Sequence, residues 1–545
     1  MVRSTLAAWT LVGLIACAGD DMDSVDSGEP MGEPDIVDVA SADAELSTLV
    51  DLVAQAGLVE TLQGDGPFTV FAPTNDAFSQ IDASGLSNEE LTEILTYHVV
   101  AGRVDSSSIP ALADSVATYT LFFDTSNGVQ VNDATVERAD IEASNGIIHV
   151  IDTVLLPPDI LTAAGFAGLS ELAGAVGAAD ASVATTLGGD GPFTVFAPTN
   201  DAFGAITAPS DPAALADILF YHAIAGAEVD SSSIPAVADS AANLTLFFDT
   251  SDGVVVNDAN VAIADVRTTN GIVHVIDKVL LPPDILTAAG FAGLNSLAGA
   301  IGSADASVVK ALSGDGPFTV FAPTDDAFGS ITAPTDPTEL ANVLFYHVYP
   351  GSIDAASIPA KADSALQNSF GINVSAVFST DGGVSINNAN VAVADVRTTN
   401  GIVHVIDAVL LPPSILDLAG YAGLSSLANA LTTAPGDLIA TLSAPGPFTV
   451  FAPTDAAFTA APAVTGKDLT NVLLYHVVDP SIAAPVLFGD LMDGEVATAL
   501  GGTDTITIDV TAGTAEGATI ALPDVNGTNG TVHVIDAVMI PPSFN

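Results

Sequence analysis

The stretch GPFTVFAPTNDAF, residues 66–78, recurs almost unchanged three more times in this chain of 545 residues. The later copies are GPFTVFAPTNDAF at 191–203, GPFTVFAPTDDAF at 316–328 and GPFTVFAPTDAAF at 446–458. Successive copies begin 125, 125 and 130 residues apart. Solenoid repeats span only about 20 to 50 residues, so a period of this length is that of a whole domain. The repeats therefore predict four domains in tandem, each with its own core.

The residues of this first block are predicted to have structural roles. Apolar side chains occur on both alternating faces of residues 68–72, which indicates a strand that is buried on both sides. Pro73 ends the strand. Thr74 or Asn75 then caps a short helix, with Asp76 in its first turn, where the helix dipole favours an anion. The block is therefore expected to be scaffold, with no residue left over for chemistry.

A second block, NGIIHVIDTVLLPP at 145–158, follows the same period. Its other copies are NGIVHVIDKVLLPP at 270–283, NGIVHVIDAVLLPP at 400–413 and NGTVHVIDAVMIPP at 529–542. Each copy ends in two prolines, and a new helical pattern starts directly after each of the first three. Because no flexible linker separates the units, we expect a semi-rigid string. The predicted domains are residues 36–158, 159–283, 284–413 and 414–545.

A third signal, a helix that ends in Tyr-His, lies between the two blocks. SNEELTEILTYHVV begins with Ser87 and Glu90 in the spacing of a capping box. Its apolar residues recur at helical spacing and share one face with His98. The same frame precedes His222, His347 and His476.

The second half of each unit has the pattern of β-strands. In LTLFFDTSDGVVVNDANV, residues 244–261, two β-rich runs flank Ser-Asp-Gly, which indicates a hairpin. Helical patterns are concentrated in the first half of the unit. This partial segregation of helices from strands favours an α+β fold over a doubly wound sheet.

The two blocks and the Tyr-His pair, in this order and at these distances, resemble the two homology boxes and the YH motif of the fasciclin (FAS1) domain family. The resemblance covers residues from about 36 to 545, in four copies. It implies domains in which a β-wedge or twisted β-sandwich packs against several α-helices. It also implies a secreted or surface-anchored role in adhesion or matrix binding, without catalytic activity.

The composition restricts the partners. The chain has 66 acidic residues and only 9 lysines and arginines, for a net charge of −57. A surface with so few cations cannot neutralise phosphates, which argues against binding to nucleic acid or to anionic membrane surfaces. Its many carboxylates are suited to weak contacts with divalent cations such as Ca²⁺.

The N-terminus, MVRSTLAAWTLVGLIAC, has the pattern of a secretory signal peptide and is too short to span a bilayer. Its last four residues resemble the bacterial lipobox, in which the cysteine, here Cys17, becomes lipidated. The alternative is an ordinary signal peptide with an incidental cysteine. We expect a signal peptide at 1–17, an acidic disordered tether at 18–35, and a protein that is exported and lipid-anchored at the surface of a bacterial cell, or is extracellular.

The eight histidines number two per unit, one in Tyr-His and one in the second block. One hypothesis brings the two together around a metal, aided by a carboxylate such as Asp152. The alternative, which we favour, is that each is buried and hydrogen-bonded, because the pair lacks the short spacing of a ligand set. We therefore expect no metal, no cofactor and no catalytic residue. The residues assigned structural roles are Phe68, Thr74, Asp76, His149, Phe193, Thr199, Asp201, His274, Phe318, Thr324, Asp326, His404, Phe448, Thr454 and His533.

Two functional hypotheses remain from the sequence, with a metal-dependent enzyme as a third and remote one. The first is multivalent adhesion to surface or matrix proteins or polysaccharides, since four units on one tether convert weak contacts into strong binding. The second is a passive acidic spacer in the envelope that binds divalent cations loosely. For adhesion, the YH motif of the family makes the Tyr-His pairs the candidate contacts: Tyr97, His98, Tyr221, His222, Tyr346, His347, Tyr475 and His476. The alternative is that each tyrosine packs against its own domain.

Overall fold

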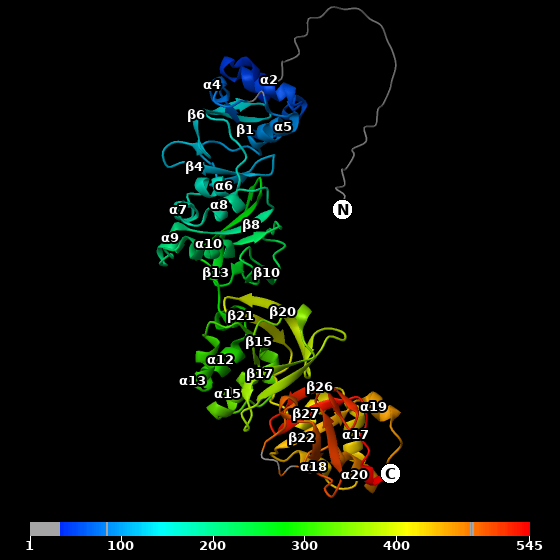
Figure 1. The fold of residues 1–545 in the computed structure, drawn as a ribbon. Helices are drawn as coiled ribbons and strands as arrows, with labels where there is room; N and C mark the ends of the chain where they lie inside the picture. The colour runs from blue at the N-terminus through cyan, green and yellow to red at the C-terminus, as the bar shows by residue number, and fades with distance from the viewer. Residues whose placement is uncertain (1–32, 83–84, 480, 482–483, 545) are drawn as a thin grey trace, which may run out of the picture. The chain divides into compact units, whose positions relative to one another are not determined.

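The computed structural model describes residues 33–82, 85–479, 481 and 484–544 (Figure 1). The predicted signal peptide, Cys17 and nearly all of the predicted tether lie outside the described residues. The chain divides into two compact units, Met1–Pro157 and Pro158–Asn545. The first contains one α+β domain and the second contains three, so the prediction of four α+β domains is confirmed. Among the described residues, every helix falls short of the length and apolar character that a membrane span needs.

In the first domain, short helices precede and follow the first strand, and most strands come later in the sequence. Ser87 and Glu90 form the predicted capping box of the helix before Tyr-His. Asp35 forms a further capping box at the start of the first helix. The elements are α1 (Ile36–Ala42), α2 (Ser47–Gln55), α3 (Val59–Leu62), β1 (Phe68–Pro73), α4 (Asn75–Phe78), α5 (Asn88–Tyr97), β2 (Val99–Ala101), β3 (Leu112–Asp114), β4 (Thr120–Asp124), β5 (Gln130–Val131), β6 (Ala134–Ala143) and β7 (Gly146–Ile151).

The sheet of this domain has the order β2-β1-β7-β6-β5-β4-β3. Strands β1 and β7, which are the first and second sequence blocks, pair in parallel from Phe68 opposite Gly146 to Pro73 opposite Ile151. The other pairs in the sheet are antiparallel. The two most repeated stretches of sequence are therefore neighbours at the centre of the fold.

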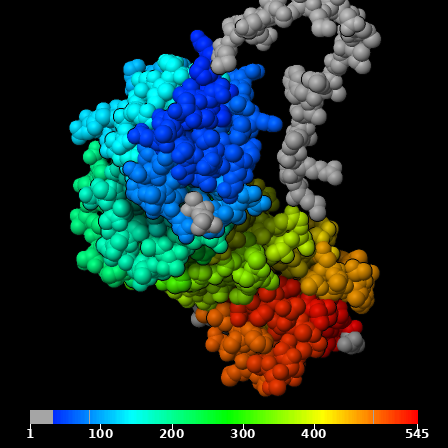
Figure 2. All heavy atoms as spheres, turned by 90° about the horizontal axis from the view of Figure 1, so that it is seen from above, coloured from blue at the N-terminus to red at the C-terminus, as the bar shows by residue number. Residues whose placement is uncertain are grey.

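Two apolar cores lie on the two faces of β1. Val70 and Ala72 face the helices, which lie on one side of the sheet in Figure 1. Phe71 faces the second core, which is enclosed by the strands and includes Tyr97 and Leu121. The prediction of a strand buried on both faces is thus confirmed. The space-filling view shows one outer face of the molecule, on which the atoms of the first domain lie in close contact (Figure 2).

The other domains repeat this plan. The second has α6 (Ile160–Phe166), α7 (Ser170–Ala178), α8 (Ala181–Leu187), β8 (Phe193–Pro198), α9 (Asn200–Gly204), α10 (Pro212–Tyr221), β9 (Ala223–Ala225), β10 (Val237–Asp239), β11 (Thr245–Asp249), β12 (Val255–Val256), β13 (Ala259–Thr268) and β14 (Gly271–Ile276). The hairpin predicted at 244–261 is the antiparallel pair β11 and β12.

The third domain has α11 (Ile285–Phe291), α12 (Asn295–Ser303), α13 (Ala306–Leu312), β15 (Phe318–Pro323), α14 (Asp325–Gly329), α15 (Pro337–Tyr346), β16 (Val348–Pro350), β17 (Lys361–Gln367), β18 (Asn373–Ser379), β19 (Ser385–Ile386), β20 (Ala389–Thr398) and β21 (Gly401–Ile406). The fourth has α16 (Ile415–Tyr421), α17 (Ser425–Thr433), α18 (Leu438–Leu442), β22 (Phe448–Pro453), α19 (Asp455–Ala460), α20 (Lys467–Tyr475), β23 (Gly494–Ala497), β24 (Thr505–Asp509), β25 (Thr514–Ala515), β26 (Ala518–Asn526) and β27 (Gly530–Ile535). In its described residues, a single bridge between Val450 and Val477 takes the place of a paired edge strand.

Within residues 158–545, successive domains contact each other directly. The ring of Phe247 from β11 lies 6.0 Å from that of Phe291 in the third domain and belongs to that domain's core. Between the third and fourth domains, Asn526 N donates to Ser375 Oγ at 2.9 Å, and Lys361 Nζ donates to Asp524 O at 2.8 Å. Successive domains of this unit are therefore joined by side-chain contacts as well as by the continuous chain.

Candidate functional site

The first block forms a strand and a helix cap. The Oγ1 atom of Thr74 accepts a hydrogen bond from Ala77 N at 3.1 Å, so Thr74 is the N-cap of α4. Asn75 instead accepts from Thr48 N and thereby joins α4 to α2. Asp76 is exposed in the first turn of the helix. The matching threonines Thr199, Thr324 and Thr454 cap their helices in the same way.

The Tyr-His pair ends the helix that packs its apolar face against the sheet. Tyr97 is the last residue of α5 and His98 is its C-cap. Helices α10, α15 and α20 end in the same manner. Because the apolar face of each helix is packed, the pair at its end is held in the interior. All four tyrosines are 0% exposed, and the four histidines are between 1% and 3% exposed.

The tyrosine hydroxyl joins the helix to the strands. Tyr97 Oη donates to Thr120 O at 2.9 Å and accepts from Asn132 Nδ2 at 2.8 Å. The second and third domains have the same two bonds. In the fourth domain, Tyr475 Oη donates to Thr505 O at 2.7 Å. Burial raises the pKa of all four tyrosines, so each stays a neutral hydrogen-bond donor.

The histidine of the pair joins the same helix to the end of the second block. His98 Nδ1 lies 2.8 Å from Ile94 O, and its Nε2 lies 2.9 Å from Leu155 N. A carbonyl only accepts and an amide only donates, so these partners assign the neutral tautomer with the proton on Nδ1. Burial lowers the pKa of His98 to about 4. The equivalent histidines His222, His347 and His476 have matching partners, and burial lowers their pKa to about 4 as well.

These observations bear on the residues chosen as candidate adhesive contacts. The structure places all eight side chains of the Tyr-His pairs in the interior, with their polar atoms hydrogen-bonded inside the domain. A partner could touch them only if the domain opened locally. Their role as contacts therefore stays a prediction, and their observed role is to connect helix, strand and second block.

The second histidine of each domain lies on the other face of the sheet. His149 is opposite Phe71 in the β1/β7 register and stacks on its ring, with centroids 5.4 Å apart. Its Nε2 lies 2.8 Å from Val104 O, and its Nδ1 accepts from Asp140 N at 3.3 Å. His98 is on the helix side, so the sheet separates the two imidazoles. The two do not converge on a common metal position, and no group of three or more His, Cys, Asp or Glu side chains within the described residues could hold a metal.

A Ser-Asp-His cluster was missed by the sequence analysis. Ser106 Oγ donates to Asp140 Oδ2 at 2.5 Å, and hydrogen bonds from Ser106 lower the pKa of Asp140. The order of the contacts differs from that of a catalytic triad, because the serine bonds to the aspartate and the histidine Nε2 faces a carbonyl. The third and fourth domains have Ala355 and Phe488 at the position of the serine. The common element is an aspartate at positive φ that accepts a backbone N–H, which is a structural role.

A second missed residue is the asparagine that opens the second block. Asn145 is buried, and its Oδ1 accepts from Ile36 N at 2.9 Å. Its Nδ2 donates to Leu62 O at 2.7 Å and to Gly64 O at 2.9 Å. The equivalent bonds recur at Asn270, Asn400 and Asn529. The repetition of Asn-Gly before each histidine strand was the available signal.

Replacing a tyrosine of the pair by phenylalanine tests its structural role. Tyr221→Phe removes one donor and one acceptor from buried partners, Thr245 O and Asn257 Nδ2. We expect the second domain to lose about 2 kcal/mol of unfolding free energy, because each orphaned buried group costs about 1–3 kcal/mol. Hydrogen exchange of peptides from this domain, recorded at increasing urea concentrations, measures the loss of unfolding free energy.

The matched control is Tyr349→Phe in the third domain. The hydroxyl of Tyr349 is buried beside that of Tyr346, and it makes no hydrogen bond of regular geometry among the described residues. Its removal is expected to leave stability unchanged or to raise it by up to about 1 kcal/mol. Equal losses in both variants would contradict the structural role of the Tyr221 hydroxyl.

The comparisons with known proteins agree with this architecture. The Fasciclin domain family matches residues 44–157, 167–282, 292–412 and 422–541. The chain therefore belongs to the fasciclin domain family, with four copies of the domain in tandem.

Individual relatives come from animals and bacteria. The chain is similar to transforming growth factor-beta-induced protein ig-h3 of Sus scrofa, with 29% identity over 518 residues, 88% of this chain and 74% of that protein. It is also similar to protein sll1483 of Synechocystis sp., with 48% identity over 132 residues, 23% of this chain and 73% of that protein. Among solved structures, it is similar to the FAS1 domain pair of the insect cell adhesion molecule fasciclin I, with 20% identity and a TM-score of 0.31 over 44% of this chain and 97% of that one.

Proposed function

We propose that this chain is a non-enzymatic, multivalent adhesion or matrix-binding protein of the cell surface. The observation that carries the proposal is the fourfold repetition of a whole fasciclin domain, with the backbone contact of the Tyr-His histidine kept in every copy. Four weak contacts on one chain raise the overall affinity by about 10²–10⁴-fold over a single contact.

The proposed partners are surface or matrix proteins or polysaccharides. A net charge of −57 favours partners that are cationic, neutral or bridged through Ca²⁺. The domains of this proposal are 36–158, 159–283, 284–413 and 414–545. Lipidation at Cys17 would anchor them at the surface of the exporting cell, with 18–35 as the tether.

The site geometry supports the absence of catalysis. The two histidines of each domain are separated by the sheet, and their ring nitrogens have backbone partners. The serine beside Asp140 has no equivalent in two of the four domains. A metal-dependent enzyme built on the paired histidines therefore has no support in this arrangement.

A passive acidic spacer is the second candidate, and the observation that favours it is the charge. An acidic coat of this size keeps a protein soluble and self-repelling without any specific partner. It predicts cation binding that is weak and spread over the surface.

Capture by coated beads separates the two functions. We expect beads coated with the chain without its predicted signal peptide to aggregate cells or retain matrix polysaccharide. The expected capture is at least tenfold greater than with beads that carry an unrelated protein of similar negative charge. The tenfold margin is a low estimate, since avidity supplies about 10²–10⁴-fold. A calcium chelator added to half of the samples shows whether cations bridge the contact.

The Tyr221→Phe variant adds a second measurement to this experiment. If the Tyr-His pairs touch the partner, the variant captures less than the unaltered chain under conditions where all domains remain folded, because one of four contacts is weakened. If they are structural, capture by the folded variant equals that of the unaltered chain. If the beads capture nothing with or without the chelator, the adhesion function is contradicted and the passive spacer is the function that remains.

A further inference from the structure

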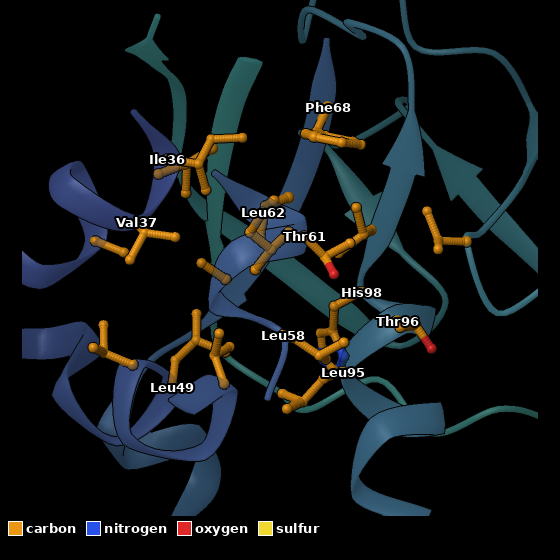
Figure 3. Close-up of a pocket in the computed structure, with 18 residues that line it drawn as sticks. Ile36, Val37, Leu49, Leu58, Thr61, Leu62, Phe68, Leu95, Thr96 and His98 are labelled. Carbon is orange, nitrogen blue, oxygen red and sulfur yellow. The ribbon is translucent and has the colours of Figure 1, made fainter. Parts of the chain in front are cut away.

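Each domain encloses an apolar chamber between its first helices, its Tyr-His helix and the sheet. Figure 3 shows the chamber of the first domain, where Ile36, Leu49, Leu62 and Leu95 point inward and the ring of His98 lies at the wall. The chamber of the second domain has the same plan. It is lined by Ile160, Leu161, Ala164, Leu172, Ala173, Val176, Leu187, Val195, Phe196, Ala197, Leu219, His222 and Val273.

The four chambers differ in size. The cavity volume is about 130 Å³ in the second domain and about 60 Å³ in the first. It is about 20 Å³ in the third and in the fourth. Only the chamber of the second domain approaches the volume of about 150 Å³ at which an engineered apolar cavity binds benzene.

Two small side chains account for the larger chamber. On the second helix, Val176 takes the position that Ile301 and Leu431 fill in the third and fourth domains. On the edge strand, Ala223 takes the position of Val348. The remaining lining residues of the second and third domains match closely. The space therefore comes from missing methyl and methylene groups and not from a different fold.

The side chains that line the chamber offer no free hydrogen-bond donor or acceptor. His222 is its one side chain with polar atoms, and Nδ1 of its ring lies 2.8 Å from Ile218 O. Its Nε2 accepts from Leu280 N at 2.8 Å. A water molecule inside would lack the two to four polar partners that it needs, so the chamber is suited to stay dry. The chamber also reaches the surface of the domain beside α7, where Ala173 is exposed and Val176 is half-buried.

We propose that the second domain binds one small uncharged hydrocarbon group, about the size of a six-carbon ring, in this chamber. The volume sets the size of the ligand, and the occupied histidine nitrogens exclude ligands that require a hydrogen bond. The site is specific to this domain, because Ile301 and Val348 fill the equivalent space in the third.

The proposal is tested by measuring, with fluorine NMR, the binding of fluorobenzene to the chain without its predicted signal peptide. We expect saturable binding of one equivalent per chain. Phenol should bind at least tenfold more weakly, because its hydroxyl would be buried without a partner. The double variant Val176→Ile with Ala223→Val should lower the affinity for fluorobenzene at least tenfold, since it gives the second domain the side chains of the third.

The reverse exchange is the matched control. Ile301→Val with Val348→Ala should open the chamber of the third domain and raise the stoichiometry from one equivalent to two. Circular dichroism and the urea midpoint establish that both variants fold. Wild-type binding that does not saturate, or that survives the filling variant unchanged, would overturn the proposal, and so would a stoichiometry that stays at one in the opened variant.

Discussion

The Gly271→Ala variant is expected to lose the fold of the second domain. Gly271 begins β14 and lies opposite Phe193, the first residue of the parallel strand β8. A Cβ at this position would lie 2.0 Å from Phe193 O and 2.8 Å from Phe193 C. The clash is with backbone, so it can be relieved only by separating the two central strands. We expect a loss of about 4 kcal/mol or more, a size reached only by disruption of a core or of a backbone position that cannot adapt.

Gly174→Ala is the control within the same domain. Gly174 is exposed in the middle of α7, and a Cβ built there has no heavy atom within 4 Å. Alanine is the better helix former, so this variant should gain about 0.5–1 kcal/mol. Hydrogen exchange of peptides from β8 and β14 reports on the second domain alone, which matters because a four-domain chain does not unfold in one step. Wild-type protection of these peptides in Gly271→Ala would contradict the packing described for the two strands.

The fold could be predicted from the sequence because its strongest signals are local. The capping box at Ser87 and Glu90 and the turn at residues 250–253 each depend on neighbours a few residues away, and each is found where it was predicted. The first block is buried on both faces as expected. The period of the blocks then gives the number of domains, because one domain is repeated almost unchanged.

The candidate site was less accessible to sequence reasoning, because its contacts join segments far apart in the chain. Whether Tyr97 is exposed depends on Asn132 and Thr120, which follow it by 35 and 23 residues. Whether two histidines converge depends on which face of the sheet each occupies, and the parallel pairing of the two blocks was not predicted. The second domain, which has the larger chamber, carries Val176 where the third has Ile301 and Ala223 where the third has Val348, a difference that appears only when the copies are aligned position by position.

Acidification from pH 7 to pH 5 is expected to destabilise every domain through the histidine of its Tyr-His pair. In His98, the folded pKa is about 4, against about 6.5 in an unfolded chain. Protonation would put an N–H on Nε2, which faces the N–H of Leu155. The unfolded chain therefore binds the proton more tightly, so the stability is fully present above pH 6.5 and is lost as the pH falls toward 4. Each histidine contributes about 2 kcal/mol of this loss by pH 5 and about 3 kcal/mol in full.

The net negative charge of the chain has the opposite effect on stability during acidification, and the choice of pH range separates the two effects. Protonation of surface carboxylates relieves self-repulsion, but it occurs mainly near pH 4, below the range from pH 7 to pH 5 over which the histidine effect is measured. Added salt screens the surface repulsion and should leave the histidine effect in place. In His98→Gln, the first domain should be less stable at pH 7 but should lose its share of the pH dependence, while the other three domains keep theirs. Domain-resolved hydrogen exchange at the two pH values measures this difference, and an unchanged slope in the first domain of the variant would refute the assignment to His98.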